Sequence, residues 1–287
     1  MTAGQVVTAI VQLGVVVGGA PLLVGLVRHL RARLEGRAGP PMSLPWRELA
    51  KQLRKETIRP EHTSWVYVAA PLVVFSTAAV VAVIVPLVST RSPFDGVGDL
   101  FVVVALLLVG SVFLALGGLD PGTAFGGMGA SREITIAALA EPTLLVATFS
   151  LAIPAGSSNL AVIVAGSLDA PARIFAVPSL LAFAALTIAG LAETARLPVD
   201  NPSTHLELTM VHEAMVLEYA GPDLALMELA SAMRLTLFAG LLASLFFPWG
   251  VTTSTGLAAL ALATVVFIAK VGVVGVVLAV LAAPAAQ

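Results

Sequence analysis

The sequence contains no cysteine and little charge. Without cysteine, the chain forms no disulfide and supplies no thiolate ligand for zinc or for an iron–sulfur cluster. Charged residues make up 11% of the 287 residues and hydrophobic residues 58%, whereas about a quarter of a soluble domain is charged. A soluble fold of this length exposes more polar surface than this composition provides. The net charge of −2 creates no long-range attraction for nucleic acid, so we expect no such partner.

The sequence also lacks a metalloprotease motif. A zincin needs the pattern HExxH, which places two histidines on one helical face. In this chain His212 and Glu213 are followed by Val216 where the second histidine would stand. His205 lies seven residues before His212, which permits one face but supplies only two ligands. We therefore expect no metal site in this chain.

Long apolar stretches dominate the sequence. A membrane span needs about 20 mostly apolar residues, because a helix rises about 1.5 Å per residue through a core of about 30 Å. Pro248, Trp249 and Gly250 divide the last stretch into two. The N-terminus has no basic residue ahead of its apolar run, so we interpret it as a retained helix rather than a signal peptide. The sequence predicts an all-α, polytopic transmembrane protein, a single domain over 1–287 with about seven spans at 3–27, 64–89, 98–118, 132–155, 172–193, 222–247 and 255–284.

Basic residues gather in the first long loop, over 28–63. Because such residues mark cytoplasmic loops, we expect this loop inside, the N-terminus outside and the C-terminus in the cytoplasm of a cell inner-membrane protein. Counting spans places 119–132 and an acidic loop, 193–221, on the same side. The opposite loops, 89–99, 156–171 and 248–254, contain a single basic residue, Arg91. Nine of the fifteen basic residues belong to the first loop: Arg28, Arg31, Arg33, Arg37, Arg47, Lys51, Arg54, Lys55 and Arg59.

Residues 44–58 within this loop predict an amphipathic helix. Leu44, Leu49 and Leu53 fall on one helical face, while Arg47 and Lys51 lie on the other. This pattern is typical of a helix that lies in the membrane interface. A solvated linker helix remains the alternative.

The densest polar segment covers 192–223. Pro198 and Pro202 interrupt the helical pattern and keep the segment outside the bilayer, and a short helix is expected from Thr204 to Leu217. Such a cluster beside membrane helices can transfer protons or can dock a soluble partner. Its ionisable residues are Glu193, Arg196, Asp200, His205, Glu207, His212, Glu213, Glu218 and Asp223.

A few ionisable residues lie inside the expected spans. Each costs several kcal/mol if it faces lipid, so each should face the protein interior or a wet cavity. They either form buried ion pairs or exchange protons across half of the membrane. Glu193 lies three residues before Arg196, so the two can share a helical face. The intramembrane residues are Glu141, Glu228, Arg234 and Lys270, with Glu193 at a helix end.

Three segments resemble one known family. They read PLLVGLVRHLRARLEGRAGPP, SREITIAALAEPTLL and ETARLPVDNPSTHLELTMVHEAMVLEY. They are similar to the membrane-anchor subunit of group-4 membrane-bound nickel–iron hydrogenases, of the formate hydrogenlyase subunit 4 or hydrogenase-4 component C type. This family is related to subunit 1 of respiratory complex I, which forms the quinone site. The resemblance covers about residues 15 to 245.

The resemblance implies a subunit of an oxidoreductase complex that is not catalytic by itself. It would anchor a soluble nickel–iron large subunit and an iron–sulfur small subunit on the cytoplasmic face, beside antiporter-like membrane subunits and lipid. It would couple electron transfer to proton or sodium translocation. The nickel–iron centre and iron–sulfur clusters would belong to the partners and no cofactor to this chain, and a bound quinone is possible but not favoured.

The resemblance also suggests roles for individual residues. Coupling is assigned to the motif positions Glu141, Glu193, Arg196, Asp200, Glu207, Glu213 and Glu218, and to the intramembrane residues Glu228, Arg234 and Lys270. Arm docking is assigned to Arg28, Arg31, Arg33, Arg37, Arg47, Lys51, Arg54, His205 and His212.

One departure and two alternatives accompany the resemblance. Family members usually have eight spans, whereas this sequence ends close to its seventh, so we expect the eighth helix to be absent. The chain could instead form the quinone site of a complex I-type dehydrogenase. A free-standing transporter would show inverted repeats with broken helices, and the sequence shows no such repeats.

Overall fold

The computed structural model describes residues 3–196, 210–254 and 256–283, and this part is helical without β-strands. Six helices are long and apolar enough to cross a membrane: α1 (Ala3–Leu34), α3 (Trp65–Ile84), α4 (Leu100–Leu119), α5 (Ala124–Ala155), α9 (Gly221–Phe246) and α10 (Leu257–Ala282). A seventh, α7 (Val177–Glu193), has 17 residues, the lower limit of about 17–25 for a span. The prediction of an all-α polytopic membrane protein is therefore confirmed.

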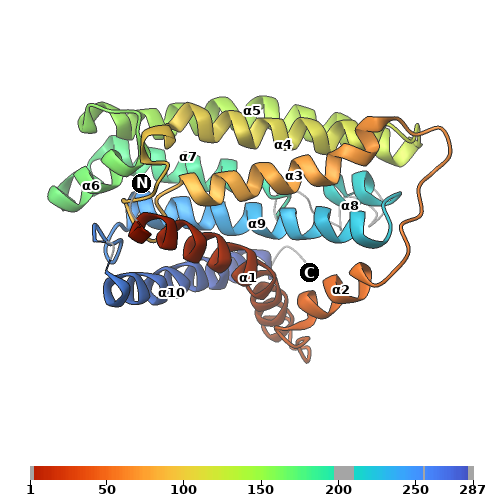
Figure 1. Ribbon diagram of the computed structural model, residues 1–287, viewed down its shortest axis with the longest axis horizontal. Helices are drawn as coiled ribbons and strands as arrows, with labels where there is room; N and C mark the ends of the chain where they lie inside the picture. Colours follow the sequence, from red (N-terminus) through yellow and green to blue (C-terminus); the bar gives the residue numbers. More distant parts are fainter. Residues whose placement is uncertain (1–2, 197–209, 255, 284–287) are drawn as a thin grey trace.

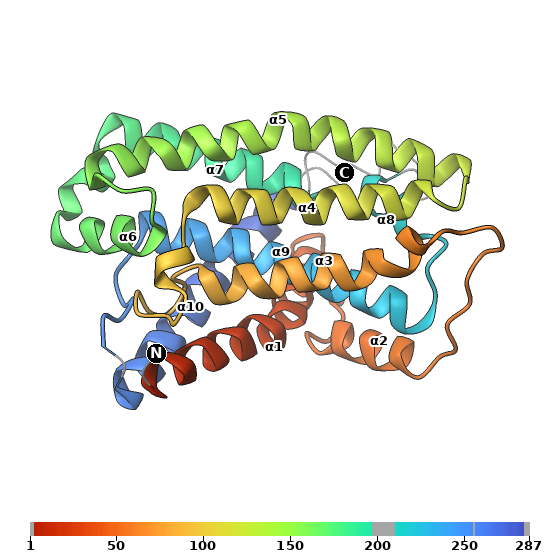
Figure 2. The same cartoon turned by 45° about the horizontal axis from the view of Figure 1, so that its top comes forward.

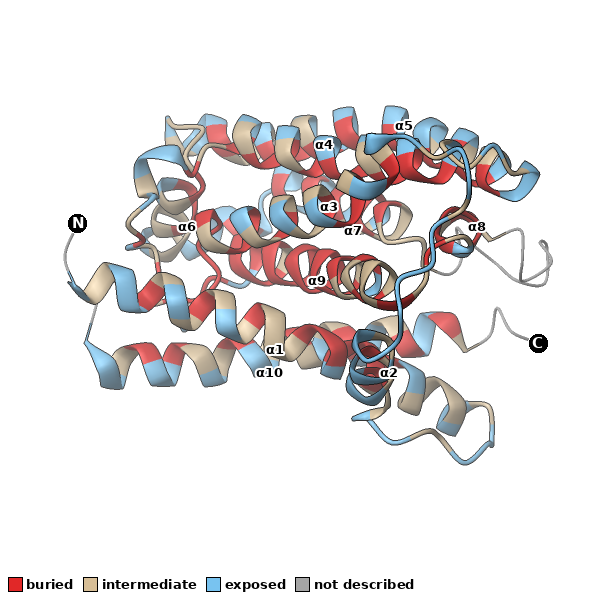
Figure 3. Cartoon of the chain, turned by 45° about the vertical axis from the view of Figure 1, so that its right-hand side comes forward, coloured by how far each residue is buried: buried red, intermediate tan, exposed pale blue. Residues whose placement is uncertain are grey.

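Helix α9 lies at the centre of the bundle. Figures 1 and 2 show α3, α4, α5 and α7 on one side of it, and α1 with α10 on the other. Most of α9 is buried, as the red ribbon in Figure 3 shows. A helix that is surrounded in this way can hold charged side chains away from lipid, which makes α9 the natural support for a buried polar site.

The outer helices expose large apolar side chains. Leu139 and Val146 on α5, Leu181 on α7 and Val273 on α10 are each more than 60% exposed. A monomer in water rarely exposes apolar surface on this scale, whereas lipid tails solvate it. These faces are consistent with the hydrocarbon core of a bilayer.

The charged segments gather at one end of the bundle, as the sequence predicts. The short helices α2 (Leu44–Leu53) and α8 (Val211–Val216) lie at this end, and α6 (Leu160–Asp169) lies at the opposite end (Figures 1 and 2). The opposite loops are joined by backbone pairs between Ser89 and Thr252 and between Asp99 and Asn159.

Several expected boundaries are wrong at the charged end. Helix α1 continues to Leu34 instead of ending at 27, so the first arginines of the loop extend a helix whose 32 residues exceed the thickness of a bilayer. Helix α5 begins at Ala124 rather than 132, and a glycine in its first turn allows close contact with α4. A Cβ at Gly126 would overlap the carbonyl oxygen of Gly118 on α4. Helix α2 stops at Leu53 instead of 58, and Leu53 is exposed.

The expected boundaries also differ at the opposite end. The segment 156–171, expected as a loop, contains α6, and residues Pro171–Phe175 form a short 3-10 helix (η2), so that α7 begins only at Val177. Helix α3 ends at Ile84 rather than 89, just before Pro86. The Gln12 side chain replaces the lost helical bonds: its Nε2 donates to the carbonyls of Ala82 and Val85 at 2.6 Å.

Candidate functional site

A buried ion pair lies in the half of the bundle nearer the charged end. The guanidinium of Arg234 on α9 donates to the Glu193 carboxylate at the end of α7, with Nη2 and Oε2 2.6 Å apart. The same Nη2 donates to Ser111 Oγ on α4 at 2.7 Å. The two charged side chains are only 6% and 1% exposed. The two charges are thus kept away from lipid and neutralise each other between α7 and α9, and Ser111 on α4 adds a hydrogen bond.

Glu141 on α5 belongs to the same neighbourhood. Its side chain is buried and interacts electrostatically with both Glu193 and Arg234. Its Oε1 has no hydrogen-bond partner among the described residues, and the same is true of Oε1 of Glu193. Arg234 therefore pairs with Glu193 and acts on Glu141 only through its charge, and each carboxylate has an oxygen available for a proton.

A small cavity of 20 Å³ extends from the ion pair towards the charged end. Glu193, Arg234, Ser231 and His212 line it together with Glu133, a buried acid of α5. This volume can hold one water molecule, which needs about 10–15 Å³. A single water molecule in this cavity would therefore have the ion pair on one side and His212 and Ser231 on the other.

A second, more open cleft of 150 Å³ lies between α1, α2, α8 and α9. His212 and Ser231 line both spaces, so the cleft and the cavity beside the ion pair are neighbours. The charged side chains of the cleft include both signs, which limits the cost of their partial burial. They are Arg28, Glu48, Arg196, Glu213 and Glu228.

Burial within this cleft changes the titration of two groups outside the spans. Burial, with a further contribution from Arg28, lowers the pKa of the Arg196 guanidinium to about 10. Burial is also the main cause that lowers the pKa of the His212 imidazole. His212 is therefore neutral at pH 7 and can accept or donate a hydrogen bond.

Helix α2 forms one wall of the cleft. The Trp46 indole donates to the carbonyl oxygen of Gly18 on α1 at 3.2 Å, and Glu48 accepts from Arg28 at 3.0 Å. Leu49 is buried beneath the helix. The expected amphipathic helix is thus held against α1 and α9 by its apolar face.

The structure separates the expected docking residues into two groups. Arg28 lines the cleft, and Arg31 and Arg37 bind Glu35 within their own loop. His212 also lines the cleft. The other four basic residues are exposed and form no ion pair with the described part of the chain: Arg33, Arg47, Lys51 and Arg54. His205 falls outside the described residues.

The expected coupling residues also lie in different places. Glu141, Glu193 and Arg234 form the buried cluster, and Arg196, Glu213 and Glu228 line the cleft. Glu218 lies beyond α8, where its backbone carbonyl accepts from the Tyr67 hydroxyl at 2.7 Å. Lys270 binds the Phe247 carbonyl oxygen at the opposite end of α9. Asp200 and Glu207 lie outside the described residues.

Two members of the site were not expected from the sequence. Ser111 lies in an uninterrupted apolar stretch of α4, where a lone serine resembles any helix-packing residue. Glu133 stands next to Arg132 at the predicted start of a span, so it resembles an interfacial charge until α5 is seen to begin at Ala124. Nor does Arg196 pair with Glu193 in the described structure, because helix α7 ends between them.

The described residues contain no cluster of three or more histidines or acids that could bind a metal ion. The site brings carboxylates and an imidazole, which can exchange protons, together with an arginine that stays charged.

Sequence comparison places the chain beside membrane subunits of respiratory type. A family model described as NADH dehydrogenase matches residues 6–286. The chain is 33% identical to hydrogenase-4 component C of Escherichia coli (strain K12), over 93% of this chain and 83% of that protein. It is 32% identical to formate hydrogenlyase subunit 4 of the same strain, over 93% and 85%. It is also 28% identical to the H subunit of NADH-quinone oxidoreductase from Paraburkholderia phymatum, over 77% of this chain and 65% of that protein.

The fold is shared with a solved structure. A chain of the membrane-bound sulfane sulfur reductase, an archaeal respiratory membrane complex, superposes with a TM-score of 0.78. The match covers 99% of this chain and 100% of the other at 19% identity, so it demonstrates a common fold.

Proposed function

The chain belongs to the NADH dehydrogenase family, and from this premise we propose that it anchors a hydrophilic redox arm and couples electron transfer there to ion movement. The motifs shared with hydrogenase-type subunits favour an arm made of a nickel–iron large subunit and an iron–sulfur small subunit. Antiporter-like membrane subunits would lie beside this chain and carry protons or sodium ions onward. The chain itself contributes acid–base groups and no redox centre.

The observation that supports coupling is the series of polar residues between the cleft and the centre of the bundle. It begins at Arg196 and His212, passes the 20 Å³ cavity and reaches the Glu193–Arg234 pair. Glu141 continues it on the next helix. Lipid and apolar side chains solvate charge poorly, so a charge inside the bundle is most stable beside these polar residues.

An electron that arrives in a docked arm would change the proton affinities of these acidic residues through its charge. Two unit charges 4 Å apart interact by about 4 kcal/mol at an effective dielectric constant of 20, far more than in water. A new negative charge near the cleft would favour protonation of Glu193, and Arg234 would then interact more strongly with Glu141. The proton affinity of the second acid would fall as that of the first rises, which moves a proton along the pair.

The alternative, a quinone site, has one observation in its favour and one against. The similarity to a subunit of an NADH-quinone oxidoreductase supports it. The cleft, however, measures 150 Å³ among the described residues, whereas pockets for small organic ligands usually measure about 300–1,000 Å³. We therefore retain coupling without a quinone as the proposed role.

We expect the charged end of the bundle to face the cytoplasm, with the N-terminus outside. Because the natural chain has no cysteine, Ser43→Cys beside α2 and Ser254→Cys at the other end provide clean single labels at exposed positions. An impermeant thiol reagent should label only the second variant in intact cells and only the first in inverted vesicles. The reverse pattern would invert the proposed topology.

The exposed basic side chains of α2 should contribute to arm docking. The double substitution Arg47→Glu and Lys51→Glu reverses two charges that form no ion pair within the described chain. Like charges across an interface cost several kcal/mol, so we expect the soluble iron–sulfur subunit to be lost during purification. Arg91→Glu, an exposed residue of the opposite end, is the matched control and should retain it. Retention of the arm by the double variant would exclude α2 from the docking surface.

A further inference from the structure

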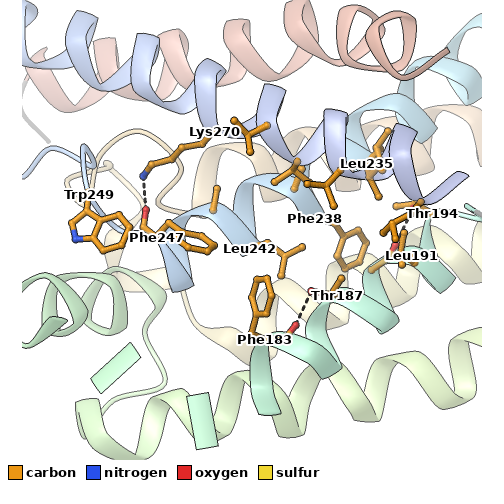
Figure 4. A pocket seen from close by; sticks show the side chains of 18 residues that line it. Phe183, Thr187, Leu191, Thr194, Leu235, Phe238, Leu242, Phe247, Trp249 and Lys270 are labelled. Atoms are coloured by element: carbon orange, nitrogen blue, oxygen red, sulfur yellow. Dashed lines mark hydrogen bonds between the residues drawn. The ribbon is translucent and has the colours of Figure 1, made fainter. Parts of the chain in front are cut away.

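An apolar groove lies on the lipid-facing side of the bundle, and only its Thr194 end reaches the polar cleft. It is enclosed by α7, α9 and α10 and has a volume of 430 Å³. Large side chains such as Phe183, Phe238 and Leu242 form its walls, and the small residues Gly190 and Ala239 leave its floor open. Figure 4 shows these walls along the groove, which extends from Trp249 to Thr194.

The interior of the groove offers no free hydroxyl to a ligand among the described residues. The hydroxyl of Thr187 donates to the Phe183 carbonyl oxygen at 2.7 Å, and that of Thr194 donates to the Gly190 carbonyl oxygen at 2.6 Å. Both hydroxyls are thus satisfied by the backbone of α7. Water in the groove would lack the two to four polar partners that it needs, whereas a hydrocarbon chain would lose nothing.

The end of the groove beside Trp249 is polar and carries a positive charge, unlike the rest of the groove. Lys270 reaches from the middle of α10 towards the end of α9, where its ammonium donates to the carbonyl oxygen of Phe247 (Figure 4). No acidic side chain of the described residues lies within 4.0 Å of it. Trp249, 49% exposed, stands beside it. A lysine side chain inside a span can extend towards the lipid headgroups in this way, and tryptophan is enriched at the headgroup level.

We propose that this groove is a binding site for an anionic glycerophospholipid. One acyl chain lies in the groove between α7, α9 and α10, and the phosphate pairs with the Lys270 ammonium. Lysine carries three donors, and the Phe247 carbonyl accepts only one, so two remain for phosphate oxygens. The uncompensated positive charge selects an anionic headgroup over a zwitterionic one.

The shape of the groove favours a lipid chain over a transmembrane helix of a partner. A helix is about 10–12 Å wide, and it would rest on the rim rather than enter a hollow of this kind. The volume instead falls within the range of about 300–1,000 Å³ that is typical of sites for small ligands. The rim on α10 is open to lipid, with Val273 64% exposed.

The test uses the native complex in nanodiscs that contain trace photoreactive phosphatidylglycerol or, in parallel, photoreactive phosphatidylcholine with the same acyl chains. Cross-linked peptides are mapped by mass spectrometry. We expect phosphatidylglycerol to label α7, α9 and α10, and Lys270→Gln to reduce this labelling about fivefold, to the level of phosphatidylcholine. Arg91→Gln, which removes a basic residue of the same end outside the groove, should change nothing.

A second variant tests the chain position independently of charge. Val274→Trp fills the groove from α10 and should abolish labelling by both lipids while the complex stays assembled. Equal labelling by the two lipids in the parent complex would overturn the headgroup assignment. Absence of lipid labelling, with cross-links from α10 to a partner protein instead, would show that a helix occupies this face.

Discussion

Replacing Arg234 with methionine is expected to destabilise the protein by about 3–5 kcal/mol, because it leaves the Glu193 carboxylate buried without its counter-ion. Ser111 alone cannot compensate, since its hydroxyl lies 3.5 Å from that carboxylate. The loss should appear as a lower yield of assembled complex and a lower melting temperature in detergent.

Two further variants separate burial from simple charge removal. Replacing both partners, Glu193→Met with Arg234→Met, should recover most of the lost stability, because an apolar pair of similar volume is often neutral or better. Arg59→Met is the matched control: it breaks the more exposed pair with Asp223 and should cost at most about 1 kcal/mol. If Arg234→Met were no more harmful than Arg59→Met, the pair would not be buried as described.

Substituting glutamine for Glu141 or for Glu193 is expected to uncouple ion movement from electron transfer. Glutamine keeps the shape of the side chain and an acceptor oxygen, but it cannot take up or release a proton. The Glu141 variant should assemble most readily, because Oε1 of Glu141 has no partner to lose among the described residues. Electron transfer with artificial carriers should persist, whereas linked ion translocation should fall to the leak rate.

Glu61→Gln provides the matched control for both variants. Glu61 is an exposed acid at the same end of the molecule, outside the cleft and the ion pair. It should assemble and translocate ions like the parent complex. A drop in translocation with Glu61→Gln would indicate a general effect of surface charge rather than a proton path.

Composition and helix periodicity were sufficient to predict the membrane fold. The break at Pro248 and Gly250 correctly separated α9 from α10, because proline and glycine interrupt an otherwise continuous apolar pattern. Hydropathy could not locate the start of α5, since glycines appear in loops and in close helix contacts alike. Gly126 belongs to the second class, and only the position of Gly118 on α4 reveals it.

The residues of the site were largely predictable, but their contacts were not. Lipid excludes isolated charge, so Glu141, Glu193 and Arg234 were evident candidates in an apolar sequence. Local spacing suggested Arg196 as the partner of Glu193, because residues three apart often share a helical face. The actual partner is 41 residues away on another helix, and such pairing depends on tertiary packing that spacing does not encode. Spacing also did not reveal that Lys270 lies apart from this cluster, because its contact with the Phe247 carbonyl oxygen likewise depends on tertiary packing.

The central claim is that the cluster of Glu141, Glu193 and Arg234 moves protons and does not merely join helices. The most direct test is the number of ions translocated per electron by the purified complex in proteoliposomes, compared among the parent, Glu141→Gln and Glu193→Gln. For Glu141→Gln the account predicts an assembled complex with electron transfer intact and an ion-to-electron ratio reduced to the level seen with an uncoupler. Glu193→Gln leaves Arg234 buried without its counter-ion and should lower the yield, and the complex that does assemble should show the same reduced ratio. Assembled variants that keep the parental ratio would contradict it, and these acids would then be structural.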